Sequence, residues 1–98
     1  MNIEKVCKET EMILNVSGRL DTTTAPSLET AVMEVVGNCD SLVLDLAGLE
    51  YISSAGLRVI LKAQKAMMVK GGMKLLHVNE TIMEIFEITG FSDILTIE

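Results

Sequence analysis

The chain is poor in aromatic residues, cysteine, histidine and positive charge. Its 98 residues include no tryptophan, one tyrosine, two phenylalanines, two cysteines and one histidine. So few cysteines and histidines complete neither a disulfide framework nor a familiar metal cluster, and we expect no bound metal. Eight basic residues against fourteen acidic ones leave a net charge of −6. This charge disfavours direct contact with nucleic acid or with an anionic membrane.

Long apolar runs are absent as well. No stretch approaches the ~20 residues that a membrane-spanning helix needs, and residues 1–6 lack the basic and then apolar layout of a signal peptide. What the chain does have is 49% hydrophobic residues, including seven methionines. These suffice for one core of aliphatic and methionine side chains. We therefore expect a single domain over residues 1–98, located in the cytoplasm.

Short apolar runs alternate with helical patterns along the chain, which indicates an α/β fold. Residues 3–6 and 12–16 predict the two strands of a hairpin, and a loop over 18–24 follows. Pro26 is tolerated in the first turn of a helix, and Gly37 ends that helix. The remaining predicted elements are a strand at 42–46, a helix that follows Ser54 and ends at Gly71, a strand at 73–78, a helix from Asn79 to Gly90 and a short edge strand at 94–97.

The order of these elements predicts the topology. Helix–strand alternation after the opening hairpin implies right-handed crossovers and a largely parallel sheet of four or five strands, with one antiparallel member. The helices are few enough to pack mainly on one face. In the helix after Ser54, apolar side chains occupy one side, while Arg58, Lys62 and Lys65 line the other at i, i+4 and i+7.

Candidates for catalysis are few. His77 alternates with apolar neighbours, and we interpret it as a partly buried structural histidine. Ser54 is not in a Gly-x-Ser-x-Gly elbow, and Gly71-Gly72 precedes a strand rather than a helix, so it is a turn and not a phosphate loop. The sequence therefore predicts a protein that is not an enzyme and that needs no cofactor.

Cys7 allows one further hypothesis, that the protein is a phosphocysteine carrier. Cys7 would then need a following loop of small residues that donate backbone N–H groups to the phosphate. Glu9 and Glu11 follow it instead, and their carboxylates would repel a phosphate. We interpret Cys7 and Cys39 as small apolar fillers in a strand and a loop.

The most informative segment, residues 42–61, joins an apolar strand to a helix through Ser53-Ser54-Ala55-Gly56. The N-terminus of a helix has unpaired N–H groups and the positive end of the macrodipole, so it suits both a capping hydroxyl and a phosphate. At least one of the two serines is predicted to be the cap. Small residues at 55 and 56 would let another macromolecule approach the backbone. Arg58, one turn beyond Ser54, could reach a phosphate there.

Residues 42–61 resemble the signature segment of STAS domains, in particular of bacterial anti-sigma-factor antagonists. Gly18-Arg-Leu-Asp21 resembles a second marker of that family, and residues 85–91 resemble a third, so that the similarity spans the whole domain. The partner-binding residues that we predict on these grounds are Asp21, Ser53, Ser54, Gly56, Leu57 and Arg58. For Asp21, a role as a turn or cap residue is an equal alternative.

The resemblance implies a partner-switching function. Such an antagonist binds an anti-sigma factor that is also a serine kinase, and so releases the sigma factor. The kinase phosphorylates one serine of the antagonist and abolishes binding, and a phosphoserine phosphatase reverses this. Aligned on Gly56, the phosphoacceptor of the family motif Asp-Ser-Ser/Thr-Gly falls on Ser54.

The sequence departs from that motif at two positions. Ser53 stands where the family often has aspartate, and Ala55 where it often has serine or threonine. Ser53 is therefore an alternative phosphoacceptor, and the identity of the kinase is open. Two other functions remain: a non-phosphorylated STAS subunit of a larger assembly, such as a lipid-transport complex, and a small phosphocarrier enzyme.

Overall fold

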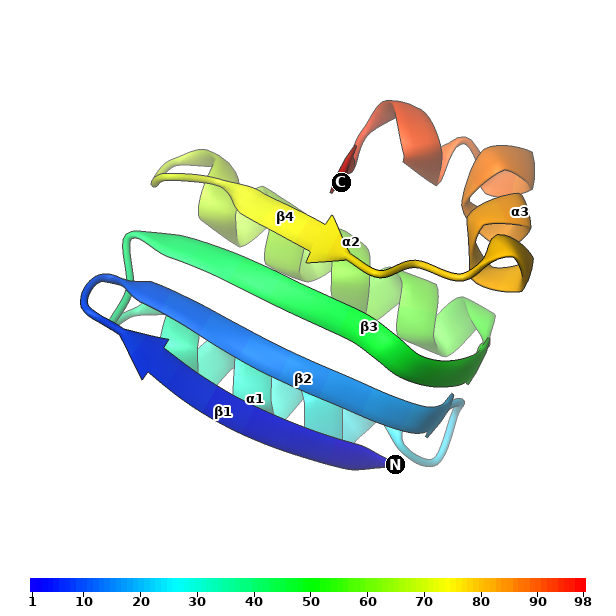
Figure 1. Cartoon of the computed structure of the whole chain (residues 1–98), viewed down its shortest axis with the longest axis horizontal. Helices are drawn as coiled ribbons and strands as arrows, with labels where there is room; N and C mark the ends of the chain where they lie inside the picture. The colour runs from blue at the N-terminus through cyan, green and yellow to red at the C-terminus, as the bar shows by residue number, and fades with distance from the viewer.

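The five strands form one mixed sheet in the order β1-β2-β3-β4-β5 (Figure 1). A computed structural model describes all 98 residues. Its elements are β1 (Asn2–Lys8), β2 (Glu11–Leu20), α1 (Ala25–Val36), β3 (Ser41–Ile52), α2 (Ser54–Met68), β4 (Met73–Leu76), α3 (Glu80–Thr89), the 3-10 helix η1 (Phe91–Asp93) and β5 (Thr96–Ile97). The β1 strand is antiparallel to β2, and every other neighbouring pair is parallel. The α/β fold, the mixed sheet and its single antiparallel member are confirmed.

The two long helices cover the same face of the sheet. Figure 1 shows α1 and α2 side by side behind the strands, while α3 lies beyond the end of β4. The prediction of helices mainly on one face is confirmed. The core lies between this face and the helices, and its fully buried side chains include Leu14, Leu44, Ile60, Leu75 and Phe86. None of the helices combines the length and the apolar composition that a membrane span requires.

Helix ends follow local chemistry. The Asn79 side chain caps α3 by accepting a hydrogen bond from the N–H of Ile82 at 2.9 Å. Gly90 ends the same helix with a φ of +81°, a conformation that glycine adopts without strain. Pro26 lies in the first turn of α1, as predicted. These helix limits depend on residues only a few positions apart, so they can be predicted from the sequence.

Three strand ends differ from the prediction. The β2 strand continues through Gly18 to Leu20, which we expected to be loop, because it pairs with an equally extended β3 that reaches Ile52. The β4 strand stops at Leu76, since His77 has a φ of +58° and leaves the strand conformation. The β5 strand starts only at Thr96, because the η1 helix occupies the preceding residues.

Two side chains are more exposed than predicted. The His77 side chain is 64% exposed, and its Nδ1 lies 3.0 Å from an Asp45 carboxylate oxygen. The interpretation of His77 as a partly buried histidine is wrong, because the residue follows β4 instead of lying inside it. Cys7 is also exposed, since it lies near the end of edge strand β1, whereas Cys39 is buried as expected.

Candidate functional site

The carboxyl ends of β2 and β3 bring the predicted site residues to one edge of the sheet. Leu20 pairs with Ile52 across these parallel strands. The backbone N–H of Ser53 also donates a hydrogen bond to the carbonyl oxygen of Leu20 at 2.9 Å. The loop that begins at Asp21 therefore lies beside the start of α2. Parallel strands that end together carry their following loops to the same edge, where ligands bind in open α/β sheets.

Ser53 is the N-cap of α2. Its backbone is extended, with φ of −99° and ψ of 175°, and its hydroxyl oxygen accepts a hydrogen bond from the N–H of Gly56 at 3.4 Å. The side chain is half-buried. The prediction that at least one of the two serines caps the helix is confirmed, and Ser53 is that residue.

Ser54 is the first residue of α2 and is exposed. Its hydroxyl makes no hydrogen bond within the chain, since the capping role belongs to Ser53. The first turn of α2 contains no acidic residue, so nothing there offsets the positive end of the helix dipole. A phosphate on Ser54 would therefore add negative charge at a helix end that stabilises it.

Gly56 and Leu57 are buried, which changes the interpretation of both. A Cβ atom on Gly56 would lie 2.6 Å from Cγ of Leu20 and 2.9 Å from Cγ1 of Ile52. Glycine is needed here so that the first turn of α2 can pack against β2 and β3. The expectation that Gly56 leaves room for a partner is wrong, because its own core fills that space. Leu57 is only 8% exposed and offers little surface to a partner.

Asp21 organises the loop before α1. One of its carboxylate oxygens accepts hydrogen bonds from the N–H groups of Thr23 and Thr24, at 3.0 and 3.1 Å. It also accepts one from the Thr23 hydroxyl at 2.7 Å. This hydroxyl is the main cause of a lowered pKa of Asp21. Desolvation is the next-largest effect and opposes it, while the backbone N–H groups of Thr23 and Thr24 and the Thr24 hydroxyl lower the pKa further. Asp21 thus has the turn role that we considered. A role in partner binding stays a prediction.

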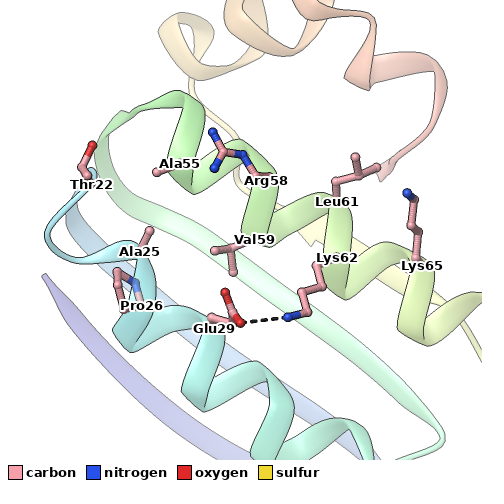
Figure 2. Close-up of a pocket in the computed structure, with 10 residues that line it drawn as sticks. All are labelled: Thr22, Ala25, Pro26, Glu29, Ala55, Arg58, Val59, Leu61, Lys62 and Lys65. Atoms are coloured by element: carbon pink, nitrogen blue, oxygen red, sulfur yellow. Dashed lines mark hydrogen bonds and ion pairs between the residues drawn. The ribbon is translucent and has the colours of Figure 1, made fainter.

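A groove runs between the outer sides of α1 and α2, and Ala55, the residue after Ser54, is one of the residues that line it (Figure 2). Its volume is about 440 Å³. Its walls are formed by Thr22, Ala25, Pro26, Glu29, Ala55, Arg58, Val59, Leu61, Lys62 and Lys65. We call it the α1–α2 groove. Arg58, which we predicted to be near the phosphoacceptor, is exposed and makes no ion pair or hydrogen bond within the chain.

Sequence reasoning missed one pair at this edge. The guanidinium of Arg19 lies over the ring of Tyr51, 4.2 Å from the ring centroid. Its Nε is also 3.9 Å from the second carboxylate oxygen of Asp21. Arg19 and Tyr51 face each other in the β2–β3 register. No short-range pattern could have predicted this contact, because it depends on how two distant strands align.

The groups at this edge of the sheet form an exposed surface. No group of three or more histidine, cysteine, aspartate or glutamate side chains could hold a metal ion. His77, whose side chain contacts Asp45, makes no contact with either serine. The exposed features at the edge are the free Ser54 hydroxyl, the unpaired Arg58 guanidinium and the Tyr51 ring that Arg19 covers. These suit recognition by another protein.

Comparison with known proteins agrees with this fold. The family model described as "STAS domain" matches residues 2–98. An anti-sigma-B factor antagonist of Listeria monocytogenes is 34% identical over 104 residues, which cover 100% of this chain and 90% of the relative.

Solved structures share the architecture. The crystal structure of an anti-sigma factor antagonist from Mycobacterium paratuberculosis has a TM-score of 0.90 at 24% identity, over 98% of this chain and 83% of that one. The Bacillus cell fate determinant SpoIIAA, solved in its phosphorylated form, has a TM-score of 0.77 at 14% identity, over 99% and 91% of the two chains. At these identities the likeness concerns the fold. Together with the family match over nearly every residue, it shows that this chain belongs to the STAS domain family.

Proposed function

We propose that this protein is an anti-sigma-factor antagonist, which binds an anti-sigma factor and thereby releases the sigma factor that it holds. The proposal is supported by similarity over the full chain to a relative with that name. The structural observation that carries it is the exposed Ser54 hydroxyl, which is free of internal hydrogen bonds at the start of α2. A serine in this position is accessible to a kinase and can lie in a protein–protein contact.

The proposed switch is phosphorylation of Ser54 by the anti-sigma factor, acting as a serine kinase. The γ-phosphoryl group of ATP is transferred to the Ser54 oxygen, ADP leaves, and the hydroxyl proton passes to a base on the kinase. A phosphoserine phosphatase hydrolyses the phosphate ester and restores binding. The protein itself supplies no catalytic group in this scheme, needs no cofactor and acts in the cytoplasm, where its sigma factor is.

Local electrostatics explain how one phosphate could stop binding without unfolding the domain. Phosphorylation adds roughly two negative charges. The N-terminus of α2 favours them, so the fold survives. A tight interface does not, because burying an unpaired charge costs several kcal/mol. SpoIIAA has this fold in its phosphorylated form, which supports the idea that the fold tolerates the modification.

Ser54 is a better acceptor than Ser53 for a steric reason. The Ser53 hydroxyl accepts a hydrogen bond from Gly56 N–H and its side chain is half-buried, whereas Ser54 is exposed. A kinase that modified Ser53 would have to break the helix cap. The proposed contact surface therefore centres on Ser54, with Asp21 and Arg58 beside it.

The test combines binding and phosphate mapping. The purified protein is titrated calorimetrically with each anti-sigma factor of its host, then incubated with the binding factor and ATP and mapped by mass spectrometry. We expect one binding factor and one phosphate, on Ser54. A phosphate that persists in Ser54→Ala and is lost in Ser53→Ala would overturn the assignment. Neither binding nor phosphate with any host anti-sigma factor would overturn the function and favour the assembly-subunit alternative.

A further inference from the structure

Arg58, Lys62 and Lys65 form a row of positive charge along α2 of this acidic protein, which we call the cationic ridge. The chain has eight basic residues and fourteen acidic ones. Three of the eight, Arg58, Lys62 and Lys65, line the α1–α2 groove, together with a single carboxylate, Glu29. Their i, i+4 and i+7 spacing places them on one side of α2. The groove is therefore locally cationic although the whole molecule is anionic.

Two of these cations have no partner in the chain. Lys62 Nζ donates to a Glu29 carboxylate oxygen at 2.8 Å, the ion pair drawn in Figure 2. Arg58 and Lys65 make no ion pair or hydrogen bond and are exposed. The paired Lys62 is itself 54% exposed, so it can contact a further anion without leaving Glu29. The exposed cations of the ridge can therefore bind carboxylates of another molecule along two turns of α2.

The floor of the groove is apolar. Ala25 and Val59 are buried between the helices, and Ala55 is half-buried next to them. A groove with small apolar residues below and cations above suits a segment that presents apolar and acidic side chains on the same side. We infer that the α1–α2 groove binds an acidic, partly apolar segment of the anti-sigma factor. This inference rests on the proposed function and assigns the chemistry of the partner.

Charge elsewhere on the molecule restricts where such a segment can dock. The pocket along α3 is lined by Glu80, Glu84 and Glu87, without a basic residue. An acidic segment is repelled there and attracted by the α1–α2 groove. Complementary charge of this kind chiefly sets orientation and association rate, so binding should weaken as salt concentration rises.

The same ridge connects the groove to the phosphorylation switch. Ser54 and Arg58 are one helical turn apart, which puts their Cβ atoms about 5–6 Å from each other. A phosphate on Ser54 can therefore pair with the free Arg58 guanidinium. It would remove one cation from the groove and repel the carboxylates of the bound segment. Phosphorylation thus closes the end of the groove nearest to Ser54 to an acidic partner.

The first experiment uses charge reversal within the groove and away from it. Lys65→Glu is the test variant, because Lys65 has no ion-pair partner within the chain that the substitution would leave unpaired. Lys8→Glu on edge strand β1 is the matched control, since Lys8 is exposed and unpaired and the charge change is the same. Calorimetry with the anti-sigma factor that binds wild type should show affinity about tenfold weaker for Lys65→Glu and a reduced dependence on salt. Lys8→Glu should stay within about twofold of wild type.

The outcomes separate this inference from the proposed function. If wild type binds and Lys65→Glu binds equally well, the groove inference is wrong and the antagonist function stands. A folded Lys65→Glu, checked by its melting curve, that binds weakly while Lys8→Glu binds normally supports the groove. If no anti-sigma factor binds wild type, the antagonist function fails, and the groove is judged by a second probe.

That second probe is a capped synthetic helix of glutamate and leucine, with a lysine-for-glutamate peptide as its control. We expect amide shifts at Ala25, Arg58 and Val59 with the acidic peptide alone, and their loss in Lys65→Glu. Equal shifts with both peptides, or none, would overturn the inference. So would co-sedimentation with phosphatidylglycerol vesicles that Lys65→Glu abolishes, because the ridge would then bind anionic lipid instead of protein.

Discussion

The N–H of Ser53 and the carbonyl oxygen of Leu20 form a 2.9 Å hydrogen bond that joins the start of α2 to the end of β2. Because of this bond, the Asp21 loop and the Ser54 hydroxyl share one edge of the sheet. The capping residue and the exposed serine are adjacent in sequence and have different environments. One serine stabilises the helix, and the other is available for modification, so that the two functions can be separated by mutation.

Serine variants should separate the cap from the proposed switch. Ser54→Ala should bind the anti-sigma factor, resist the kinase and be constitutively active, because the free hydroxyl contributes no internal hydrogen bond. Ser54→Asp should bind weakly, since a carboxylate brings negative charge to the contact.

Both Ser54 variants should melt within a few degrees of wild type. Ser53→Ala, which loses the cap, should be less stable by ~1 kcal/mol and melt about 4–8 °C lower. Thermal denaturation followed by circular dichroism checks this, and equal melting of all three variants would contradict the assignment of the cap.

Gly56→Ala should destabilise the domain by about 1–3 kcal/mol. The new methyl group would lie 2.6 Å from Cγ of Leu20, which is fully buried and cannot move without disturbing the core. Gly37→Ala is the control, because a Cβ there meets nothing within 4 Å and the backbone is helical, with a φ of −75°. It should be neutral or slightly stabilising. Urea denaturation measures the unfolding free energy of both variants. If Gly56→Ala is as stable as Gly37→Ala, Gly56 is not required for packing, and its role in partner binding becomes a hypothesis again.

Asp21 should give the protein a pH-dependent stability in the acid range. The Thr23 hydroxyl is the main group that holds the pKa of Asp21 below its ordinary value. A depressed pKa in the folded state means that the ionised carboxylate stabilises the fold above about pH 4. This contribution is lost as the pH falls through the folded-state pKa. The difference in unfolding free energy between wild type and Asp21→Ala should therefore shrink on going from neutral pH to strongly acidic pH.

The cause of that shift has its own test. Thr23→Val removes the hydroxyl that contributes most and keeps the size of the side chain, so it should raise the pKa of Asp21. Carbon-detected NMR titration of the carboxyl group measures this. A pKa of Asp21 unchanged in Thr23→Val would show that the backbone N–H donors and the Thr24 hydroxyl, not the Thr23 hydroxyl, are responsible.

The two thiols should differ in reactivity. Cys7 is exposed, whereas Cys39 is 4% exposed, and burial raises the pKa of the Cys39 thiol. A disulfide reagent such as Ellman's reagent should therefore label the Cys7 thiol rapidly in the native protein and the Cys39 thiol only on unfolding. Cys7→Ser should remove the rapid phase. Loss of the slow phase instead would mean that Cys39 is the accessible thiol.

Features that depend on neighbouring residues can be predicted from the sequence. A hydroxyl before an apolar helical pattern predicts a cap at Ser53 or Ser54, and an amide side chain predicts one at Asn79, because capping needs groups only three positions apart. The alternation of strands and helices likewise implied the parallel sheet with one antiparallel member, since a helical crossover joins parallel strands and a tight hairpin joins antiparallel ones.

Tertiary structure alone decided the rest, because it depends on contacts between segments that are distant in sequence. The β2–β3 register put Arg19 on Tyr51, and the packing of α2 against Leu20 made Gly56 a buried residue. His77 became exposed because β4 ended one residue before it. The periodicity of α2 placed three cations on one side, but only its pairing with α1 made them the wall of a groove. Local rules act over about one helical turn, whereas long-range packing sets which surfaces meet.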